Sequence, residues 1–320
     1  MPKVIFFTSL VPKIVEQFTQ QTPAGYEMQV HSNKLPDTEK ITLAQEADFL
    51  LLFPSEISDE VLKAAPNVKL IQLVSAGFDR INMALCQELG IPVANNGGTN
   101  AIDVAEHTLT LILSFYRRLL EMDSNVRTDN WKGLDSGVTT YTIHGKTVGI
   151  IGLGHIGQQV AQRLSSFGAR ILFYDPYPPA PAVVQALEAT QASLDDLLRQ
   201  SDIVTLHVPL MDSTHHFIGQ RELALMKPNA LLVNTCRGPV IDEAALTNTL
   251  RERQIFGAAL DVLEKEPPAP NNPLLRLENV LFTPHTAGVT FDTWARRAEF
   301  IFQNFERVWQ GQPPRAIVKG

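Results

Sequence analysis

Short apolar runs alternate with longer amphipathic stretches along the whole chain of 320 residues. Apolar runs bounded by turn residues are typical of strands, and those that are apolar throughout are typical of strands buried on both faces. The alternation predicts an α/β fold in which crossover helices connect the strands of parallel sheets. The expected strands form two series, the first near 3–8, 26–31, 47–53, 68–74 and 91–94, and the second near 146–152, 170–175, 203–208, 230–235, 257–262 and 279–283.

The amphipathic stretches predict helices, for example over Glu60–Ala65, where Pro66 ends the pattern. Two of the expected helices are long. One runs from about Ala101 to Asn125, and the other runs from about Phe291 to Trp309. The chain is long enough for two domains. A last helix that returns to the first domain makes that domain discontinuous.

Composition excludes several classes of protein. Hydrophobic residues make up 44% of the chain and charged residues 19%, as in globular proteins. The 27 Lys and Arg residues against 34 Asp and Glu residues give a net charge of −7, which opposes binding to nucleic acid or an anionic membrane. Two cysteines, Cys86 and Cys236, fit a reducing compartment and exclude a disulfide framework or a cysteine-based zinc site. With no apolar run long enough to span a bilayer, we expect a soluble, cytoplasmic protein without a metal.

A glycine-rich turn follows the expected strand at Thr147–Ile151 and opens a helical pattern. In the turn, Gly152 permits a tight bend, Gly154 lets the backbone approach a pyrophosphate, and Gly157 lets the helix pack against the strand. The free N–H groups at a helix start favour an anion. The turn therefore predicts a dinucleotide site, whose string of residues is Gly152-Leu153-Gly154-His155-Ile156-Gly157.

Asp175 identifies the dinucleotide that this site prefers. It ends the next strand, Ile171–Tyr174, and lies 18 residues after Gly157. An acidic residue at this place accepts hydrogen bonds from the adenosine ribose hydroxyls and repels a 2′-phosphate. Because no Arg or Lys follows directly, we predict NAD rather than NADP. His155 lies inside the motif, where its backbone N–H matters and its imidazole has no expected catalytic role.

Three polar side chains follow three strands of the second series. Parallel strands deliver such residues to one rim, where ligands of doubly wound sheets bind. Arg237 can hold a carboxylate in fork geometry. His285 can give a proton to a ketone as hydride arrives, and Glu266 beside it favours the imidazolium. Singly, each residue also suits a structural role or a solvated loop, but together they suit reduction of a 2-oxo acid. The preceding strands are Leu231–Thr235, Gly257–Val262 and Val280–Thr283.

The chain resembles the NAD-dependent D-isomer-specific 2-hydroxyacid dehydrogenase family. The motifs that carry the resemblance appear in family order over nearly the whole chain. They are Val74-Ser75-Ala76-Gly77-Phe78-Asp79, Val104-Ala105-Glu106-His107, Asn234-Thr235-Cys236-Arg237-Gly238-Pro239-Val240-Ile241-Asp242-Glu243, Asp261-Val262-Leu263-Glu264-Lys265-Glu266-Pro267 and Pro284-His285-Thr286-Ala287-Gly288.

The resemblance implies a role for each residue of the site. In the family, the equivalent of His285 is the general acid for reduction and the base for oxidation, Glu266 orients it, and Arg237 binds the carboxylate and polarises the carbonyl. Asp261 is expected to contact the nicotinamide carboxamide. The cofactor-binding set implied by the motifs is Gly152, Gly154, His155, Ile156, Gly157, Asp175, His207, Pro209, Thr235, Cys236, Arg237, Asp261, His285 and Gly288.

The resemblance also implies a substrate pocket and a domain plan. The loop from Ser75 through Ala76 and Gly77 to Phe78 is expected to present N–H groups to the substrate carboxylate, with Phe53 as a pocket wall. The family fold has two similar doubly wound domains. We expect a flavodoxin-like substrate domain over 1–99 plus 288–320 and a Rossmann NAD-binding domain over 100–287. Family members are usually homodimers built around the helix that matches 101–125.

Differences from relatives in the superfamily narrow the range of candidate substrates. Glu266 favours a hydroxy acid, because formate dehydrogenases of this superfamily have Gln there. Ala76 disfavours phosphite oxidation, which relatives with Lys at this position catalyse, and the chain stops before the regulatory domain of many phosphoglycerate dehydrogenases. Glyoxylate, hydroxypyruvate, pyruvate or a longer 2-oxo acid remain. The alternative is an NADH-sensing corepressor-like protein with little turnover.

Cys236 suggests one further hypothesis. It lies next to Arg237, whose charge can stabilise a thiolate, so thiol reagents would inactivate the enzyme and bound NADH would protect it. The other interpretation is a small buried side chain that only fills space.

Overall fold

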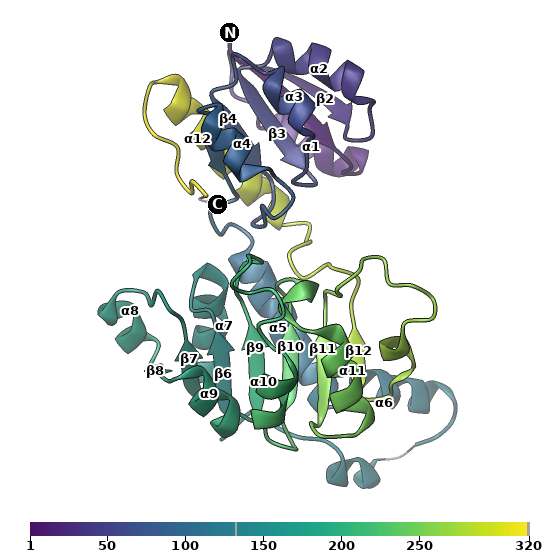
Figure 1. Ribbon diagram of the computed structural model, residues 1–320. Coiled ribbons are helices and arrows are strands. Elements are labelled where there is room, and N and C mark those ends of the chain that lie inside the picture. Colours follow the sequence, from purple (N-terminus) through teal and green to yellow (C-terminus); the bar gives the residue numbers. More distant parts are fainter. Residues whose placement is uncertain (132, 319–320) are drawn as a thin grey trace. The chain divides into compact units, whose positions relative to one another are not determined.

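The computed structural model describes residues 1–131 and 133–318, which form two compact units. The first unit comprises Met1–Asn100 and the chain from Thr290 onward, and the second comprises Ala101–Val289. In Figure 1 the purple start of the chain and the yellow helix near its end both belong to the first unit. Residues 319–320, which fall in the expected substrate domain, lie outside the described residues.

The first unit is built on a parallel sheet with the strand order β2-β1-β3-β4-β5. In chain order this is 2-1-3-4-5, the order of flavodoxin-like folds. Near the chain end, the Val318 N–H donates to the Val93 carbonyl at 2.9 Å and ties this segment to the sheet. The strands are β1 (Lys3–Thr8), β2 (Glu27–Ser32), β3 (Phe49–Phe53), β4 (Leu70–Leu73) and β5 (Val93–Ala94).

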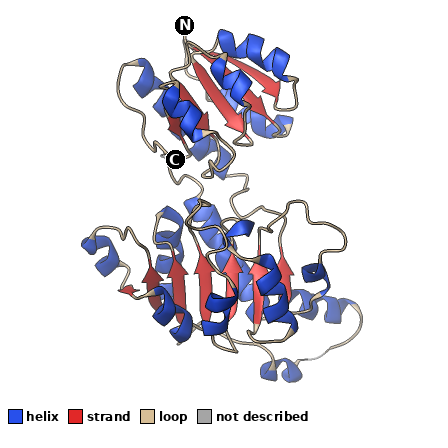
Figure 2. Ribbon diagram, viewed as in Figure 1, coloured by secondary structure: helices blue, strands red, loops and turns tan. Residues whose placement is uncertain are grey.

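Helices cover both faces of this sheet (Figure 2). Apolar residues of α2, α3 and α4 pack on one face, and those of α1 and α12 pack on the other. Trp294, Ile301 and Phe305 of α12 are buried at helical spacing, and the Phe305 ring lies 4.5 Å from that of Phe49 in β3. The last helix is therefore part of the first unit's core. The helices are α1 (Pro12–Gln20), α2 (Asp37–Gln45), α3 (Asp59–Lys63), α4 (Met83–Glu88) and α12 (Thr293–Trp309).

The second unit contains a parallel sheet in the order β12-β11-β10-β9-β6-β7-β8. The chain builds outward from β6 to one side and then from β9 to the other, which is the Rossmann order with its switch point between these two strands. The strands are β6 (Thr147–Ile151), β7 (Arg170–Tyr174), β8 (Thr190–Gln191), β9 (Ile203–Leu206), β10 (Leu231–Asn234), β11 (Gly257–Leu260) and β12 (Val280–Phe282).

The strands in the middle of this sheet are apolar, as expected where helices cover both faces of a sheet. Residues of α5 and α7 pack on one face, and residues of α9, α10 and α11 pack on the other. The helices are α5 (Ala101–Tyr116), α6 (Leu119–Arg127), α7 (His155–Ser166), α8 (Pro181–Ala186), α9 (Leu194–Gln200), α10 (Gln220–Leu225) and α11 (Glu243–Arg251), with short 3₁₀ turns at Leu134–Val138, Gly238–Val240 and Pro273–Arg276.

The predicted fold class, two doubly wound parallel sheets, is confirmed. The prediction of one helix from Ala101 to Asn125 was wrong, because the helix ends at Tyr116 and a second begins at Leu119. Arg118 between them adopts a left-handed backbone with φ of 49°, and the Tyr116 carbonyl accepts a hydrogen bond from the Tyr141 N–H at 2.9 Å. The short strand β8 was not predicted.

Candidate active site

The glycine-rich turn joins β6 to α7 and has the close contacts that its glycines predict. A Cβ on Gly152, whose φ is 94°, would lie 2.6 Å from the His207 carbonyl oxygen, and one on Gly157 would lie 2.1 Å from the Gly152 oxygen. At Gly154, which precedes α7, a Cβ would meet nothing within 4 Å. The first and third glycines thus pack the turn, while the second leaves open space at the helix N-terminus beside the backbone of His155 and Ile156. Such a cradle fits a pyrophosphate.

Asp175 is fixed at the end of β7, against this turn. Its carboxylate accepts hydrogen bonds from the Leu153 N–H at 2.7 Å and from the Tyr177 N–H at 2.8 Å, one on each oxygen. A carboxylate has about four acceptor positions, so both oxygens can still accept bonds from ribose hydroxyls. The turn and its acidic partner are therefore held in the arrangement that a dinucleotide requires.

The loop after β9 begins with His207 and Val208 and continues through Pro209. The Nε2 atom of His207 lies 3.0 Å from Thr205 Oγ1, while its Nδ1 atom is buried with no hydrogen-bond partner among the described residues. Burial lowers the pKa of this imidazole to about 3, so the ring is neutral at physiological pH. An unpaired buried nitrogen at the switch point of the sheet fits a site completed by a bound ligand.

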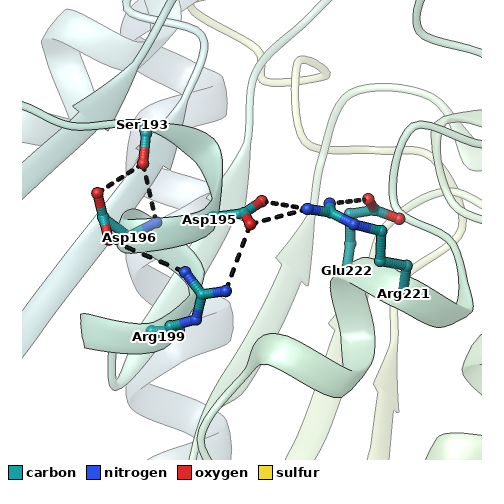
Figure 3. Close-up of polar contacts among 6 residues, drawn as sticks. All are labelled: Ser193, Asp195, Asp196, Arg199, Arg221 and Glu222. Carbon is teal, nitrogen blue, oxygen red and sulfur yellow. Dashed lines mark hydrogen bonds and ion pairs between the residues drawn. The ribbon is translucent and has the colours of Figure 1, made fainter.

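The loop after β9 leads to α10, and charged side chains connect α10 to α9 (Figure 3). Arg221, in the first turn of α10, donates from Nη2 to both oxygens of Asp195 on α9 at 2.8 Å and from Nη1 to Glu222 at 2.8 Å. Arg199 of α9 bonds to Asp195 as well, at 3.4 Å. Pairs of this kind are solvated and contribute little stability, but they fix α10 against α9.

The rim formed by β10, β11 and β12 carries Arg237, Glu266 and His285. His285 Nδ1 lies 2.6 Å from Glu266 Oε2, and the other carboxylate oxygen accepts the Leu263 N–H at 3.1 Å. Burial opposes ionisation of Glu266, but the hydrogen bond from His285 and the charges of His285 and Arg237 outweigh it and hold the pKa of this carboxyl below its usual value. Glu266 is therefore an anion, oriented toward the imidazole. Glu266 and His285 of the predicted triad thus lie in contact within one unit, and the charge of Arg237 acts on the same carboxyl.

Asp261 accepts several hydrogen bonds from the backbone around His285. His285 has a left-handed φ of 54°, which is uncommon for a residue with a Cβ. Its N–H donates to the Asp261 carbonyl at 2.7 Å, and the N–H groups of Thr286 and Ala287 donate to the two Asp261 carboxylate oxygens at 2.9 Å each. Three successive backbone N–H groups thus donate hydrogen bonds to Asp261. The predicted contact of Asp261 with the nicotinamide carboxamide stays a prediction.

The residues after β10 line the same rim. Thr235 is buried, and its hydroxyl lies 3.1 Å from that of Thr108 on α5. The Cys236 thiol donates to Asn234 Oδ1 at 3.1 Å. Burial raises the pKa of this thiol to about 11 and outweighs the neighbouring Arg237 charge. The interpretation as a reactive thiolate is therefore not supported, because Cys236 remains a protonated thiol at neutral pH.

In the first unit, the Ser75–Phe78 loop follows β4 and is held by polar contacts. The Ser75 hydroxyl lies 2.5 Å from that of Ser55, and the Asn95 side chain donates to the Ala76 carbonyl at 2.9 Å. With its carbonyl engaged, the peptide at Ala76 is fixed in orientation, and so are the neighbouring N–H groups of the loop. Phe53 ends β3 and packs edge-on against Trp294, with ring centroids 6.0 Å apart.

These contacts include residues that the sequence did not assign to the site. Asn95 belongs to a turn-forming cluster, Asn95–Asn100, whose composition predicts a loop but not a partner. Trp294 belongs to the buried stripe of α12 and is indistinguishable from core by its spacing. Only the contacts in the folded unit connect them with the Ser75–Phe78 loop and Phe53.

Comparison with known proteins decides the family. Residues 109–287 match the family model described as D-isomer specific 2-hydroxyacid dehydrogenase, NAD binding domain. A glyoxylate reductase of Thermofilum pendens is 41% identical over 99% of this chain and 94% of its own length. The chain belongs to the D-isomer specific 2-hydroxyacid dehydrogenase family.

Two other relatives show the breadth of this family. A D-3-phosphoglycerate dehydrogenase of Methanocaldococcus jannaschii is 36% identical over 89% of this chain, which spans 54% of that enzyme. The crystal structure of D-lactate dehydrogenase with NAD+ from Lactobacillus jensenii has a TM-score of 0.81 and 28% identity, and the match covers 99% of this chain and 100% of that one. This dehydrogenase is accordingly an NAD-dependent oxidoreductase that acts on the CH–OH group of 2-hydroxy acids.

Within residues 1–131 and 133–318, no group of three or more His, Cys, Asp or Glu side chains is arranged to hold a metal ion. None of the helices in this part of the dehydrogenase combines the length and the apolar character needed to cross a bilayer.

Proposed function

We propose that this dehydrogenase reduces a small 2-oxo acid of the glyoxylate, hydroxypyruvate or pyruvate type with NADH, and that His285 is the general acid. The observation that carries the proposal is the 2.6 Å contact of His285 Nδ1 with an ionised Glu266. Glu266 occupies Nδ1 of the ring, which leaves Nε2–H free to donate a proton. In the reverse direction the neutral ring accepts that proton from the hydroxyl.

Each remaining part of the substrate has a proposed partner. Arg237 binds the carboxylate and polarises the carbonyl, because a guanidinium can donate two parallel hydrogen bonds. In the first unit, the N–H groups of Ala76 and Gly77, on the loop after Ser75, are the proposed donors to a substrate carboxylate, and Phe53 is the proposed wall beside the C3 substituent. Residues 1–99 and 288–320 are thus the proposed substrate domain. Residues 100–287 are the proposed cofactor domain, which also carries Arg237, Glu266 and His285.

The cofactor residues have distinct tasks in this proposal. When bound, NADH supplies the hydride. The N–H groups at the start of α7 hold the pyrophosphate and Asp175 receives the ribose hydroxyls, while the neutral His207 with Pro209 lines the adenine side. Thr235, Cys236 and Gly288 line the nicotinamide side and keep water away from it. The tightly packed glycine turn and the unpaired His207 Nδ1 support this assignment.

Glyoxylate is the first substrate to test, because full-length relatives at 35–41% identity carry the name glyoxylate reductase. The oxidation of NADH is followed by absorbance with glyoxylate, hydroxypyruvate, pyruvate, 2-oxobutyrate, oxaloacetate and phenylpyruvate. The same assays are then repeated with NADPH in place of NADH. We expect NADH turnover with a two- or three-carbon acid. A His285→Ala variant should bind NADH but lose turnover by about 10²–10⁴-fold. NADH binding without turnover of any acid would contradict the proposal and favour a sensor.

We also propose a cytoplasmic homodimer assembled around α5 and the segment that follows it. Large apolar side chains on this segment are exposed in the single chain, notably Leu120, Leu134 and Val138. Contiguous exposed apolar surface is typical of interaction sites. Light scattering after size exclusion measures the mass directly, and a monomer at micromolar concentration would contradict this part of the proposal.

A further inference from the structure

His107 lies on α5 and has no part in the function proposed above. Its side chain is largely buried, with 21% of its surface exposed. The Nε2 atom lies 3.0 Å from Thr283 Oγ1 and 3.5 Å from Asp261 Oδ1. Both partners belong to the loops that follow β12 and β11, so one imidazole reaches the two strand ends next to His285.

The direction of these hydrogen bonds follows from the protonation of Asp261. Burial opposes its ionisation, but hydrogen bonds from His107, Thr283 and the amides of Thr286 and Ala287 outweigh it and lower the pKa of the carboxyl. Thr283 Oγ1 lies only 2.5 Å from Asp261 Oδ1. The single hydroxyl hydrogen must therefore point at the carboxylate, and the Thr283 oxygen can only accept from His107. The Nε2 atom of His107 consequently carries a hydrogen.

These contacts converge on the backbone that carries His285. Thr283 comes two residues before His285, and Asp261 accepts the N–H groups of residues 285, 286 and 287. The left-handed backbone of His285 persists only where the surroundings hold it. A donor on Asp261 and Thr283 therefore acts on the residue that faces Glu266.

We propose that His107 is a positioning residue for the reaction: its Nε2–H fixes Thr283 and Asp261, and these fix the Thr283–Ala287 loop with His285 at hydrogen-bond distance from Glu266. The inference rests on the proposed role of His285. It requires a hydrogen-bond donor at this point of α5, and the bulk of a ring alone does not suffice. Residues that act in this way move kcat, because a displacement of about 1 Å at the reacting group can cost about 10²-fold.

Two substitutions at position 107 distinguish the effect of the hydrogen-bond donor from the effect of side-chain size. His107→Phe keeps a ring without a donor, and His107→Gln places an amide N–H near the position of Nε2. We expect His107→Phe to lower kcat with the best 2-oxo acid by about 10–100-fold with little change in KM for that acid, and His107→Gln to recover most of the loss. His31→Phe, at a histidine of β2, is the matched control and should retain the wild-type kcat. Full kcat in His107→Phe, or equal losses in the Phe and Gln variants, would overturn the inference.

Thr283→Val tests the same connection from its other end and keeps it testable if His107→Phe does not fold. We expect Thr283→Val to lower kcat, and the double variant to lose much less than the product of the two single losses, because both remove one connection. Independent, multiplicative losses would overturn the inference. His285→Ala measured in parallel separates the two claims: its full activity rejects the proposed function, whereas its inactivity beside a fully active His107→Phe rejects only the role of His107.

Discussion

Two of the histidine–carboxylate pairs in the second unit, His285–Glu266 and His107–Asp261, differ in exposure. The His285 and Glu266 side chains are 48% and 30% exposed, with a single direct contact of 2.6 Å. Asp261 is 1% exposed and pairs with the 21% exposed His107 at 3.5 Å, and the Thr283 hydroxyl lies within hydrogen-bond distance of both. The ring of the first pair is the more exposed of the two, so it is the one that we propose to meet a substrate.

The partners of the two carboxylates explain what each pair does. Glu266 accepts one amide and one imidazole hydrogen bond, so its side-chain partner is the ring that we propose as the general acid. Asp261 accepts from Thr283 and from two successive amides, so its charge is matched to fixed backbone. In the proposed function, the same pairing of imidazole and carboxylate therefore serves proton transfer at an exposed edge and holds a loop in a buried setting.

Glu266→Gln is the strongest way to break this contrast. The amide keeps the shape of the Glu266 side chain and can still form a hydrogen bond with His285, but it removes the negative charge of the carboxylate. We expect kcat/KM for the 2-oxo acid to fall by about 10²–10⁴-fold with NADH affinity unchanged, as measured by NADH fluorescence titration and steady-state rates. A loss of only a few-fold would place Glu266 outside the chemistry.

Asp261→Asn tests the role of the buried pair through the free energy of unfolding. An amide cannot accept two loop amides and the Thr283 hydroxyl together as well as a carboxylate does, and we expect a loss of about 1–3 kcal/mol at neutral pH by urea unfolding. The folded-state pKa of Asp261 is lowered, so its stabilisation is present above the unfolded-state value of about 4 and disappears as the pH falls through the lower folded-state value. The difference between wild type and variant should shrink below pH about 4. A difference that is constant with pH would contradict a charged anchor.

The charged side chains around Asp195 in Figure 3 have no proposed part in proton transfer or in holding the His285 loop. They serve as the control for the two pairs. Arg221→Gln removes the bonds to Asp195 and Glu222 from an arginine side chain that is 63% exposed. We expect a change in melting temperature within about 2 °C and an unchanged kcat, because surface substitutions of this kind have small effects. A large drop in NADH affinity would show that α10 controls the loop after His207 more strongly than we propose.

The sequence predicted those parts of the site whose signals are local. The turn at Gly152–Gly157 is a contiguous string with a physical requirement at each glycine, and Arg237, Glu266 and His285 each follow a readable apolar strand. The parallel sheets were predictable for the same reason. Near-continuous apolar runs are needed wherever helices cover both faces of a sheet.

The features that the sequence missed depend on distant contacts. The break at Arg118 has no Gly or Pro, and the partner of the Tyr116 carbonyl is Tyr141. Strand β8 consists of two exposed residues, Thr190 and Gln191, so no apolar run marks it. The contact of His107 with Thr283 joins positions 176 residues apart, which no local pattern can encode.

The most direct test of the central claim compares kcat/KM for the 2-oxo acid with the free energy of unfolding in wild type, Glu266→Gln and Asp261→Asn. The account predicts that Glu266→Gln lowers kcat/KM strongly and the free energy of unfolding only slightly, because Glu266 and the His285 ring that it contacts are both partly exposed. Asp261→Asn should lower the free energy of unfolding more than Glu266→Gln does, because the buried Asp261 carboxylate accepts two loop amides and the Thr283 hydroxyl. Near wild-type kcat/KM in Glu266→Gln, or a larger loss of stability in Glu266→Gln than in Asp261→Asn, would contradict the division of labour between the two pairs.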